Sequence, residues 1–316
     1  MLRLRAELLT RIRAFFAARG VLEVDTPALS VAAISDPHLA SFATVYSGPG
    51  PRHGRTLYLH TSPEFPMKRL LAAGSGCIYQ IARVFRDGEA GRLHNPEFTL
   101  LEWYRVGFDH RRLMDEVTEL ATELLAGRVS LAEPERLSYR AAFQRHLDLD
   151  PHRATVTELV VCAERFGVPI PPGMPADETD PWLDLLLTHR IEPRLGAGRL
   201  TFLYDYPASQ AALARLRPGD PPVGERFELY LNGVELANGF HELGDAVEQR
   251  RRFEEENAVR RARGLPEMPV DEHLLAALAT GLPDCAGVAL GFDRLAMLAA
   301  GKQSLAEVLT FPFERA

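Results

Sequence analysis

The chain of 316 residues has little cysteine, no excess of positive charge and no long apolar run. Its three cysteines, Cys77, Cys162 and Cys285, lie far apart and match neither metal-binding nor redox spacing. They are typical of core residues in a reducing compartment. With no signal peptide and no stretch that would span a membrane, they predict a cytoplasmic protein without membrane association. The histidines, among them His38 and His53, form no cluster with ligand spacing, so we expect no metal site built on histidine.

The formal net charge of −7 argues against the strongly basic surface of most nucleic-acid-binding proteins, although it leaves room for a local basic patch. With 46% hydrophobic residues, the chain can bury a sizeable core as one large domain or two small ones. Apolar periodicity predicts helices at 2–19, 65–73, 113–125, 182–195 and 248–263, and strands at 21–27, 57–61, 78–85, 98–104 and 200–204. The helix at 248–263 is highly charged, and we expect it to be largely solvated.

The most informative segment is 85–104, FRDGEAGRLHNPEFTLLEWY. Two apolar runs, 78–85 and 98–104, flank a polar loop, which predicts a hairpin with a cationic tip. The polar and charged side chains of this loop include Arg86, Arg92, His94 and Asn95. The planar guanidinium of arginine matches phosphate or carboxylate oxygens. Phe98 offers a flat face on which a base can stack. The segment therefore predicts a nucleotide site, with an ordinary solvated basic hairpin as the alternative.

A second segment, GVALGFDRLAML at 287–298, predicts a buried strand, a tight turn and a helix. We expect Asp293 to cap this helix and Gly301 to end it. Arg294 lies in the first turn, where the helix N-terminus also favours anions, so the segment suits a phosphate.

A third segment, FELYLNGVELANGFHE at 227–242, contains Asn-Gly between two apolar runs, which is a strong hairpin signal. With this turn, Tyr230 faces Glu235, and Glu228 lies on the same face as Tyr230. Glu228 and Glu235 therefore converge diagonally, and a cation between them would relieve their repulsion. Mg²⁺ bridging ATP phosphates is one candidate, and two solvated surface glutamates are the alternative.

These segments resemble class II aminoacyl-tRNA synthetases, and most closely lysyl-tRNA synthetases. Segment 85–104 resembles motif 2, and segment 287–298 resembles motif 3. The helix, strand and Pro27 near the start resemble motif 1, which forms the homodimer interface in the family. The resemblance implies an α+β protein with the class II catalytic fold, an antiparallel sheet flanked by helices. It also implies that ATP and an amino acid react to form an adenylate.

The resemblance also implies roles for single residues. Arg86 would bridge the substrate carboxylate and the α-phosphate, and Arg294 would hold the γ-phosphate. The implied ATP contacts are Arg86, Asp87, Gly88, Glu89, His94, Asn95, Phe98, Glu235, Leu236, Gly291 and Arg294. The implied contacts to the amino acid are Ser62, Pro63, Glu64, Tyr104, Glu242 and Ala289. Glu64 would take the amino group at the reacting end, and Glu242 and Tyr104 the distal ammonium. Glu228 and Glu235 would hold Mg²⁺.

The resemblance covers nearly the whole chain, which we expect to be a single catalytic domain, 1–316, with an insertion of helices and loops at about 143–181. The anticodon-binding barrel of lysyl-tRNA synthetases is missing, and the ending at 301–311 differs from theirs. In both features the chain resembles the family of elongation factor P–(R)-β-lysine ligases, which are free-standing paralogues of the lysyl-tRNA synthetase catalytic domain. This implies transfer of (R)-β-lysine, or lysine, to a lysine side chain of elongation factor P, with tRNA a poor acceptor.

Two departures from the synthetase pattern fit the paralogue. Residues 86–89 read Arg-Asp-Gly-Glu, where synthetases have Arg-Asn-Glu-Gly, so Glu89 stands one place later than the usual glutamate. Ala289 replaces a glycine beside the amino-acid pocket, and one methyl changes discrimination by only ~1–3 kcal/mol. Two other hypotheses remain open. One is a truncated lysyl-tRNA synthetase that charges tRNA, and the other is a non-catalytic regulator, which would be expected to have lost Arg86, Arg294 or the glutamates.

Overall fold

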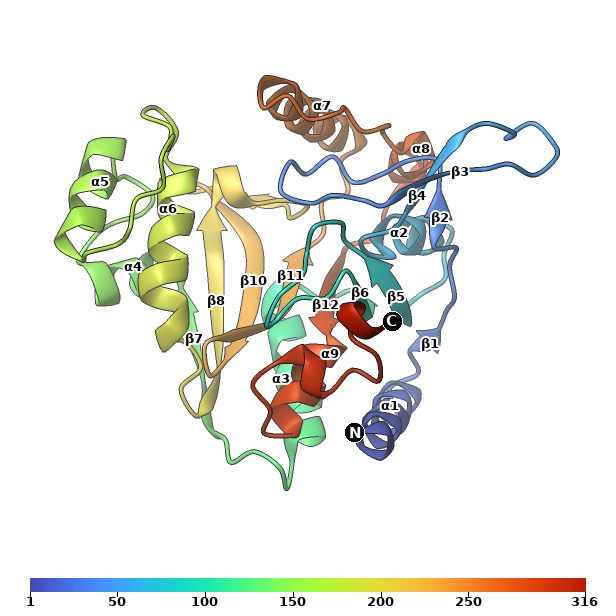
Figure 1. Ribbon diagram of the computed structural model, residues 1–316, viewed down its shortest axis with the longest axis horizontal. Coiled ribbons are helices and arrows are strands. Elements are labelled where there is room, and N and C mark those ends of the chain that lie inside the picture. The colour runs from blue at the N-terminus through green and yellow to red at the C-terminus, as the bar shows by residue number, and fades with distance from the viewer. The chain divides into compact units, whose positions relative to one another are not determined.

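The computed structural model describes all residues 1–316, and the chain divides into two compact units. The first unit contains residues 1–108 and 243–316, and the second contains residues 109–242. Figure 1 shows that each unit contains strands covered by helices. No helix combines the length and the apolar composition that crossing a membrane requires.

The first unit is built on a sheet segment with the strand order β1-β5-β6-β12. The strands are β1 (Leu22–Glu23), β5 (Ile78–Phe85), β6 (Glu97–Val106) and β12 (Cys285–Gly291). The pairing of β1 with β5 is parallel, whereas β6 pairs antiparallel with both β5 and β12. A small second sheet has the order β2-β4-β3, with β2 (Leu29–Ser30), β3 (Ala43–Val45) and β4 (Thr56–Leu59). The helices are α1 (Leu2–Ala17), α2 (Glu64–Ala72), α7 (Ala246–Ala262), α8 (Glu272–Thr280) and α9 (Phe292–Ala299).

The core of the first unit explains why α1 forms where the periodicity places it. Leu8, Ile12, Phe15 and Phe16 lie on its buried face. The ring of Phe16 stacks on Tyr79 of β5 at a centroid distance of 4.4 Å, and offset aromatic pairs of this kind stabilise beyond the area they bury. The first helix is thereby packed onto the strand that leads into the motif 2 loop.

The second unit is built on a sheet segment with the order β11-β10-β8-β7, and β9 pairs with β10. The strands are β7 (Ala132–Ser138), β8 (Arg199–Pro207), β9 (Leu216–Arg217), β10 (Val223–Leu231) and β11 (Val234–His241). The helices are α3 (His110–Leu125), α4 (Tyr139–Leu147), α5 (Val156–Arg165) and α6 (Asp180–Leu186). In Figure 1, α4, α5 and α6 lie together beside β7 and β8. Their apolar faces and β8 share a core that includes Tyr139, Phe143, Trp182 and Leu203.

Most of the elements expected from the sequence are confirmed, and local rules explain them. Asn232 and Gly233 adopt φ angles of 51° and 72° in the turn between β10 and β11, as a tight hairpin requires. Asp109 caps α3 by accepting a hydrogen bond from the Arg112 amide. Only four residues of α7 are buried, so its largely solvated character is also confirmed.

Three details of the sequence interpretation are wrong. The expected helix at 182–195 ends as α6 at Leu186 and continues as a π turn, Leu187–Ile191, and a 3₁₀ turn, Glu192–Arg194. Pro193 explains why a regular α-helix does not run on to 195, because proline lacks the N–H that would bond to the carbonyl of residue 189 and its ring clashes with that carbonyl. The strand expected at 21–27 spans only Leu22–Glu23. Asp293 does not cap α9, because Gly291 occupies the N-cap and the buried Asp293 carboxylate binds elsewhere.

Candidate active site

The first unit presents one continuous face along β6, on which alternate side chains point the same way. Phe98, Leu100, Glu102 and Tyr104 share this face. On β12 the residues paired with Leu100, Glu102 and Tyr104 are Gly291, Ala289 and Gly287. The residues of β12 on this side are thus small at three alternate positions, beside apolar, aromatic and acidic side chains on β6. The pattern G-V-A-L-G therefore keeps the side chains on this side of β12 small.

One end of this face carries Arg86, which directly follows β5. Its guanidinium lies over the Phe98 ring, 5.1 Å from the centroid, and lies 3.6 Å from the Glu89 carboxylate. The Nε–H of Arg86 is buried and has no hydrogen-bond partner. Glu89, standing one place later than the usual glutamate, does contact the arginine. The guanidinium is thus held beside the Phe98 ring and keeps one N–H donor unused. This arrangement suits a nucleotide whose base stacks on the ring and whose phosphate accepts from the arginine.

The motif 2 loop and the motif 3 helix meet through His94. Arg294 donates from Nη2 to His94 Nε2 at 2.9 Å and from Nε to the Leu93 carbonyl at 3.2 Å. Burial lowers the pKa of His94, and the Arg294 charge lowers it further, so the ring accepts this bond as a neutral imidazole. Arg86 and Arg294, which come from separate segments, thus both lie near one histidine, and their roles at the phosphates stay a prediction.

Asp293, next to Arg294, is 2% exposed and fixes the start of α9. One carboxylate oxygen accepts from Arg5 Nη1 at 2.5 Å, and the other accepts from the Thr99 amide at 2.7 Å. The carboxylate therefore connects α1, β6 and α9. Asn95 helps to hold the loop, since its Oδ1 accepts from the Phe313 amide.

The other end of the face is acidic and was only partly foreseen. Glu102 is 2% exposed, and its two carboxylate oxygens accept hydrogen bonds from Ser62 Oγ at 2.6 Å and Tyr104 Oη at 2.7 Å. A buried carboxylate oriented by two hydroxyl groups is well suited to an ammonium ligand. Ser62 also accepts from the Glu64 amide, and Glu64 pairs with the buried Lys68 at 2.5 Å.

The sequence interpretation missed Glu102. The available signal was an acidic residue inside the buried run Leu100–Tyr104, which a strand tolerates only with partners or a function.

The structure also places other residues that the sequence analysis named. Pro63 occupies the N-cap of α2, and Ala289 lies opposite Glu102. The Asp87 amide donates to the Ala40 carbonyl, and Gly88 adopts a φ of 78°.

The second unit contains the acidic hairpin. Tyr230 pairs with Glu235 across it, as the turn predicted. Glu228 is buried, pairs with Arg226 and accepts from Tyr230 Oη at 2.6 Å. Tyr230 also donates to a third carboxylate that sequence reasoning missed, Glu192, at 3.3 Å.

The three carboxylates of this hairpin region influence one another. Burial raises the pKa of Glu192, and the charges of Glu228 and Glu235 raise it further, to about 7 in all. Carboxylate oxygens are the ligands that Mg²⁺ prefers, so the chemistry of these donors fits that ion. Arg226 offsets part of the negative charge on Glu228. Leu236 and Glu242 of the same unit are 1% and 2% exposed.

Comparison with known proteins identifies the fold. The sequence model of the class II tRNA synthetases (D, K and N) matches residues 1–315, and the chain belongs to this family. Within it, the chain is 53% identical over 312 residues to proteins named elongation factor P–(R)-β-lysine ligase from Salmonella paratyphi A and Salmonella arizonae, covering 99% of this chain and 94% of each relative. The ligase of Vibrio vulnificus is also 53% identical, over 99% of this chain and 95% of its own length.

Proposed function

We propose that this protein is an ATP-dependent ligase that activates (R)-β-lysine as an adenylate and transfers it to a lysine side chain of elongation factor P. The observation that carries the proposal is the 53% identity to ligases of that name over 99% of the chain. It is supported by the arginine pair at one end of the β6 face and the buried carboxylate at the other.

In the first step an oxygen of the substrate carboxylate attacks the α-phosphorus of ATP. A new P–O bond forms, the bond to the bridging α,β-oxygen breaks, and pyrophosphate leaves with the electron pair. Both reactants are anionic, so the enzyme's work is positioning and charge neutralisation. Arg86 bridges the carboxylate and the α-phosphate, Arg294 holds the γ-phosphate, and Phe98 stacks the adenine. The neutral His94 orients Arg294.

The acidic hairpin of the second unit would supply the Mg²⁺ site. Glu228 and Glu235 would hold Mg²⁺. The ion, when bound, offsets the negative charge of the phosphate oxygens. Arg226 and Tyr230 hold Glu228 so that its carboxylate keeps one orientation.

The amino acid is recognised by its ammonium groups. Glu64 takes the amino group near the reacting carboxylate, and Glu242 with Tyr104 takes the distal one. We add Glu102 to this set, because its carboxylate accepts hydrogen bonds from Ser62 and Tyr104, two residues of the implied amino-acid site. The Ala289 methyl, level with Glu102, adds bulk relative to the glycine of synthetases and would bias the choice between α- and β-amino acids.

In the second step the neutral amine of the acceptor lysine attacks the adenylate carbonyl. A C–N bond forms, the C–O bond to AMP breaks, and the amine proton passes to solvent. The net charge of −7 disfavours tRNA as the acceptor, because tRNA binding depends on many phosphate contacts. We further propose a homodimer formed through motif 1, where Leu2 and Leu22 are 66% and 57% exposed, and reaction in the cytoplasm.

A competition between acceptors tests this function. The protein is mixed with ATP, Mg²⁺, labelled (R)-β-lysine, elongation factor P and tRNA in one tube, and acid-stable label is counted in protein and in RNA. We expect label in elongation factor P. The label is expected to disappear with Arg294→Ala and to remain with Arg83→Ala, which changes an exposed side chain of β5. Efficient tRNA charging without labelled protein would replace the ligase with a lysyl-tRNA synthetase, and label in neither would favour the non-catalytic regulator.

A further inference from the structure

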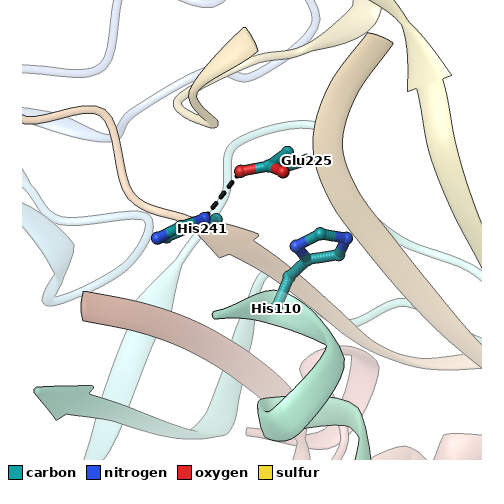
Figure 2. A group of neighbouring side chains, drawn as sticks. All are labelled: His110, Glu225 and His241. Carbon is teal, nitrogen blue, oxygen red and sulfur yellow. Dashed lines mark hydrogen bonds and ion pairs between the residues drawn. The ribbon is translucent and has the colours of Figure 1, made fainter. Parts of the chain in front are cut away.

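A second cluster of side chains lies in the second unit, apart from the three carboxylates of the hairpin. His110 is the first residue of α3, Glu225 belongs to β10 and His241 is the last residue of β11. One ligand-type atom from each lies within 4.8 Å of the others. Figure 2 shows the two imidazole rings on neighbouring sides of the Glu225 carboxylate. His110 and His241 are only 2% and 8% exposed. The expectation that the histidines form no cluster is therefore wrong for these two residues.

The hydrogen bonding of the cluster is incomplete around His110. His241 Nδ1 lies 2.6 Å from Glu225 Oε2, a full hydrogen bond. In contrast, both ring nitrogens of His110 are buried without a hydrogen-bond partner, and so is Oδ1 of Asp205. These two groups face each other at 3.8 Å, which is too far for a hydrogen bond. Buried polar atoms without partners are rare, because each costs the free energy of its lost hydration.

The backbone of Asp205 and the position of Arg217 also indicate that the side chains around the cluster are held in place. Asp205 holds a φ of 60°, a left-handed conformation that a non-glycine residue adopts at a cost. Arg217 approaches one oxygen of each carboxylate, Asp205 Oδ2 at 2.5 Å and Glu225 Oε1 at 3.5 Å. The other oxygens, Asp205 Oδ1 and Glu225 Oε2, face the histidines. Such outer partners orient the groups that bind a metal.

We propose that His110, His241 and Glu225 form a site for a divalent transition metal of the zinc type, with Asp205 or water as the fourth ligand. Two imidazoles and a carboxylate suit Zn²⁺ with tetrahedral geometry, whereas Mg²⁺ and Ca²⁺ prefer oxygen ligands alone. The ion takes the place of the proton shared by His241 and Glu225. At ligand distances of about 2.0–2.1 Å, that pair opens from 2.6 Å to about 3.3 Å. His110 then gains the partner its ring lacks.

The site has a structural role, since its ligands come from α3, β10 and β11. It would tie the start of α3 to the hairpin that carries Glu228 and Glu235. It would also fix the end of β11, where Glu242 follows His241 directly.

Metal binding can be tested without reference to catalysis. The full-length protein is stripped with a chelator and titrated with Co²⁺ under saturating Mg²⁺, and the visible absorption of four-coordinate Co²⁺ is recorded. Native mass spectrometry with Zn²⁺ counts the ions. We expect one tightly held ion, and affinity lowered at least about 100-fold in His110→Gln and His241→Gln, because the loss of an outer partner alone costs 10–100-fold.

Two variants serve as controls. His189→Gln changes an exposed histidine of the same unit, and Glu235→Gln changes the carboxylate hairpin; both are expected to keep the Co²⁺ spectrum. X-ray absorption of the zinc-loaded wild type, which needs no variant, is expected to show two imidazole ligands. The proposal is overturned if the wild type takes up no stoichiometric metal, if His110→Gln binds as tightly as wild type, or if Glu235→Gln abolishes the signal.

Discussion

Arg86 is the residue whose removal tests the candidate active site most directly. In the free protein its guanidinium stacks on Phe98 and pairs with Glu89, while its buried Nε–H lacks a partner. The contribution of these contacts to folding is small, because a partly exposed i,i+3 ion pair is worth about 0–1 kcal/mol. Its contribution to the first step is large, because a preorganised donor to developing charge is worth about 2.7–4 kcal/mol.

We therefore expect Arg86→Ala to fold normally and to lower the rate of adenylate formation by about 10²–10³-fold. The assay is exchange of labelled pyrophosphate into ATP in the presence of (R)-β-lysine, which reports the first step without an acceptor protein. The melting temperature, followed by circular dichroism, checks the fold.

Arg83→Ala is the matched control for this experiment. Arg83 lies on β5, the strand that Arg86 follows; its side chain is exposed and lies 3.7 Å from the Glu97 carboxylate. Its removal is expected to leave exchange unchanged. The assignment of Arg86 is refuted if a folded Arg86→Ala protein exchanges pyrophosphate at the wild-type rate, or if Arg83→Ala loses as much activity.

Three further predictions follow from the buried carboxylates. Glu242→Gln is expected to raise the KM for lysine-type substrates by a factor that corresponds to ~3–5 kcal/mol and to leave the KM for ATP unchanged; the reverse pattern would contradict its role. Glu102→Gln is expected to lower kcat/KM for the amino acid with little change in melting temperature, and unchanged kinetics would remove it from the site. Because the folded-state pKa of Glu192 is raised from 4.5 to about 7, its stabilising contribution is full below pH 4.5 and is lost as pH rises through 7. Without Mg²⁺, Glu192→Gln should thus melt higher than wild type at pH 8 but not at pH 4.5, and an equal difference at both would disprove this.

Sequence reasoning succeeded where neighbours along the chain determine the structure. The bounds of β5 at Ile78 and Phe85 and the pairing of Tyr230 with Glu235 follow from alternation and from the Asn-Gly turn. The arginines of motifs 2 and 3 stand out in the sequence because a charge just after an apolar strand is a local signal, and their roles stay predictions.

The failures concern partners that are distant in sequence. A carboxylate in the first turn of a helix has the same local pattern whether it caps the helix or, like Asp293, binds Arg5 and the Thr99 amide. Glu192 and Glu228 are 36 positions apart, and His110 and His241 are 131 apart. No spacing rule brings such pairs together; the strand order within the second unit does.

The Asp293 carboxylate also has a consequence for the local opening of the protein. Through this one side chain the first helix, the strand that carries Phe98 and the helix that carries Arg294 are joined by charge-assisted bonds. The amide that it accepts from, that of Thr99, can exchange its hydrogen with solvent only when that bond breaks. Hydrogen exchange at the Thr99 amide therefore reports the release of segments from both ends of the chain. Asp293→Asn would speed exchange at Thr99 more than exchange at the other amides of β6.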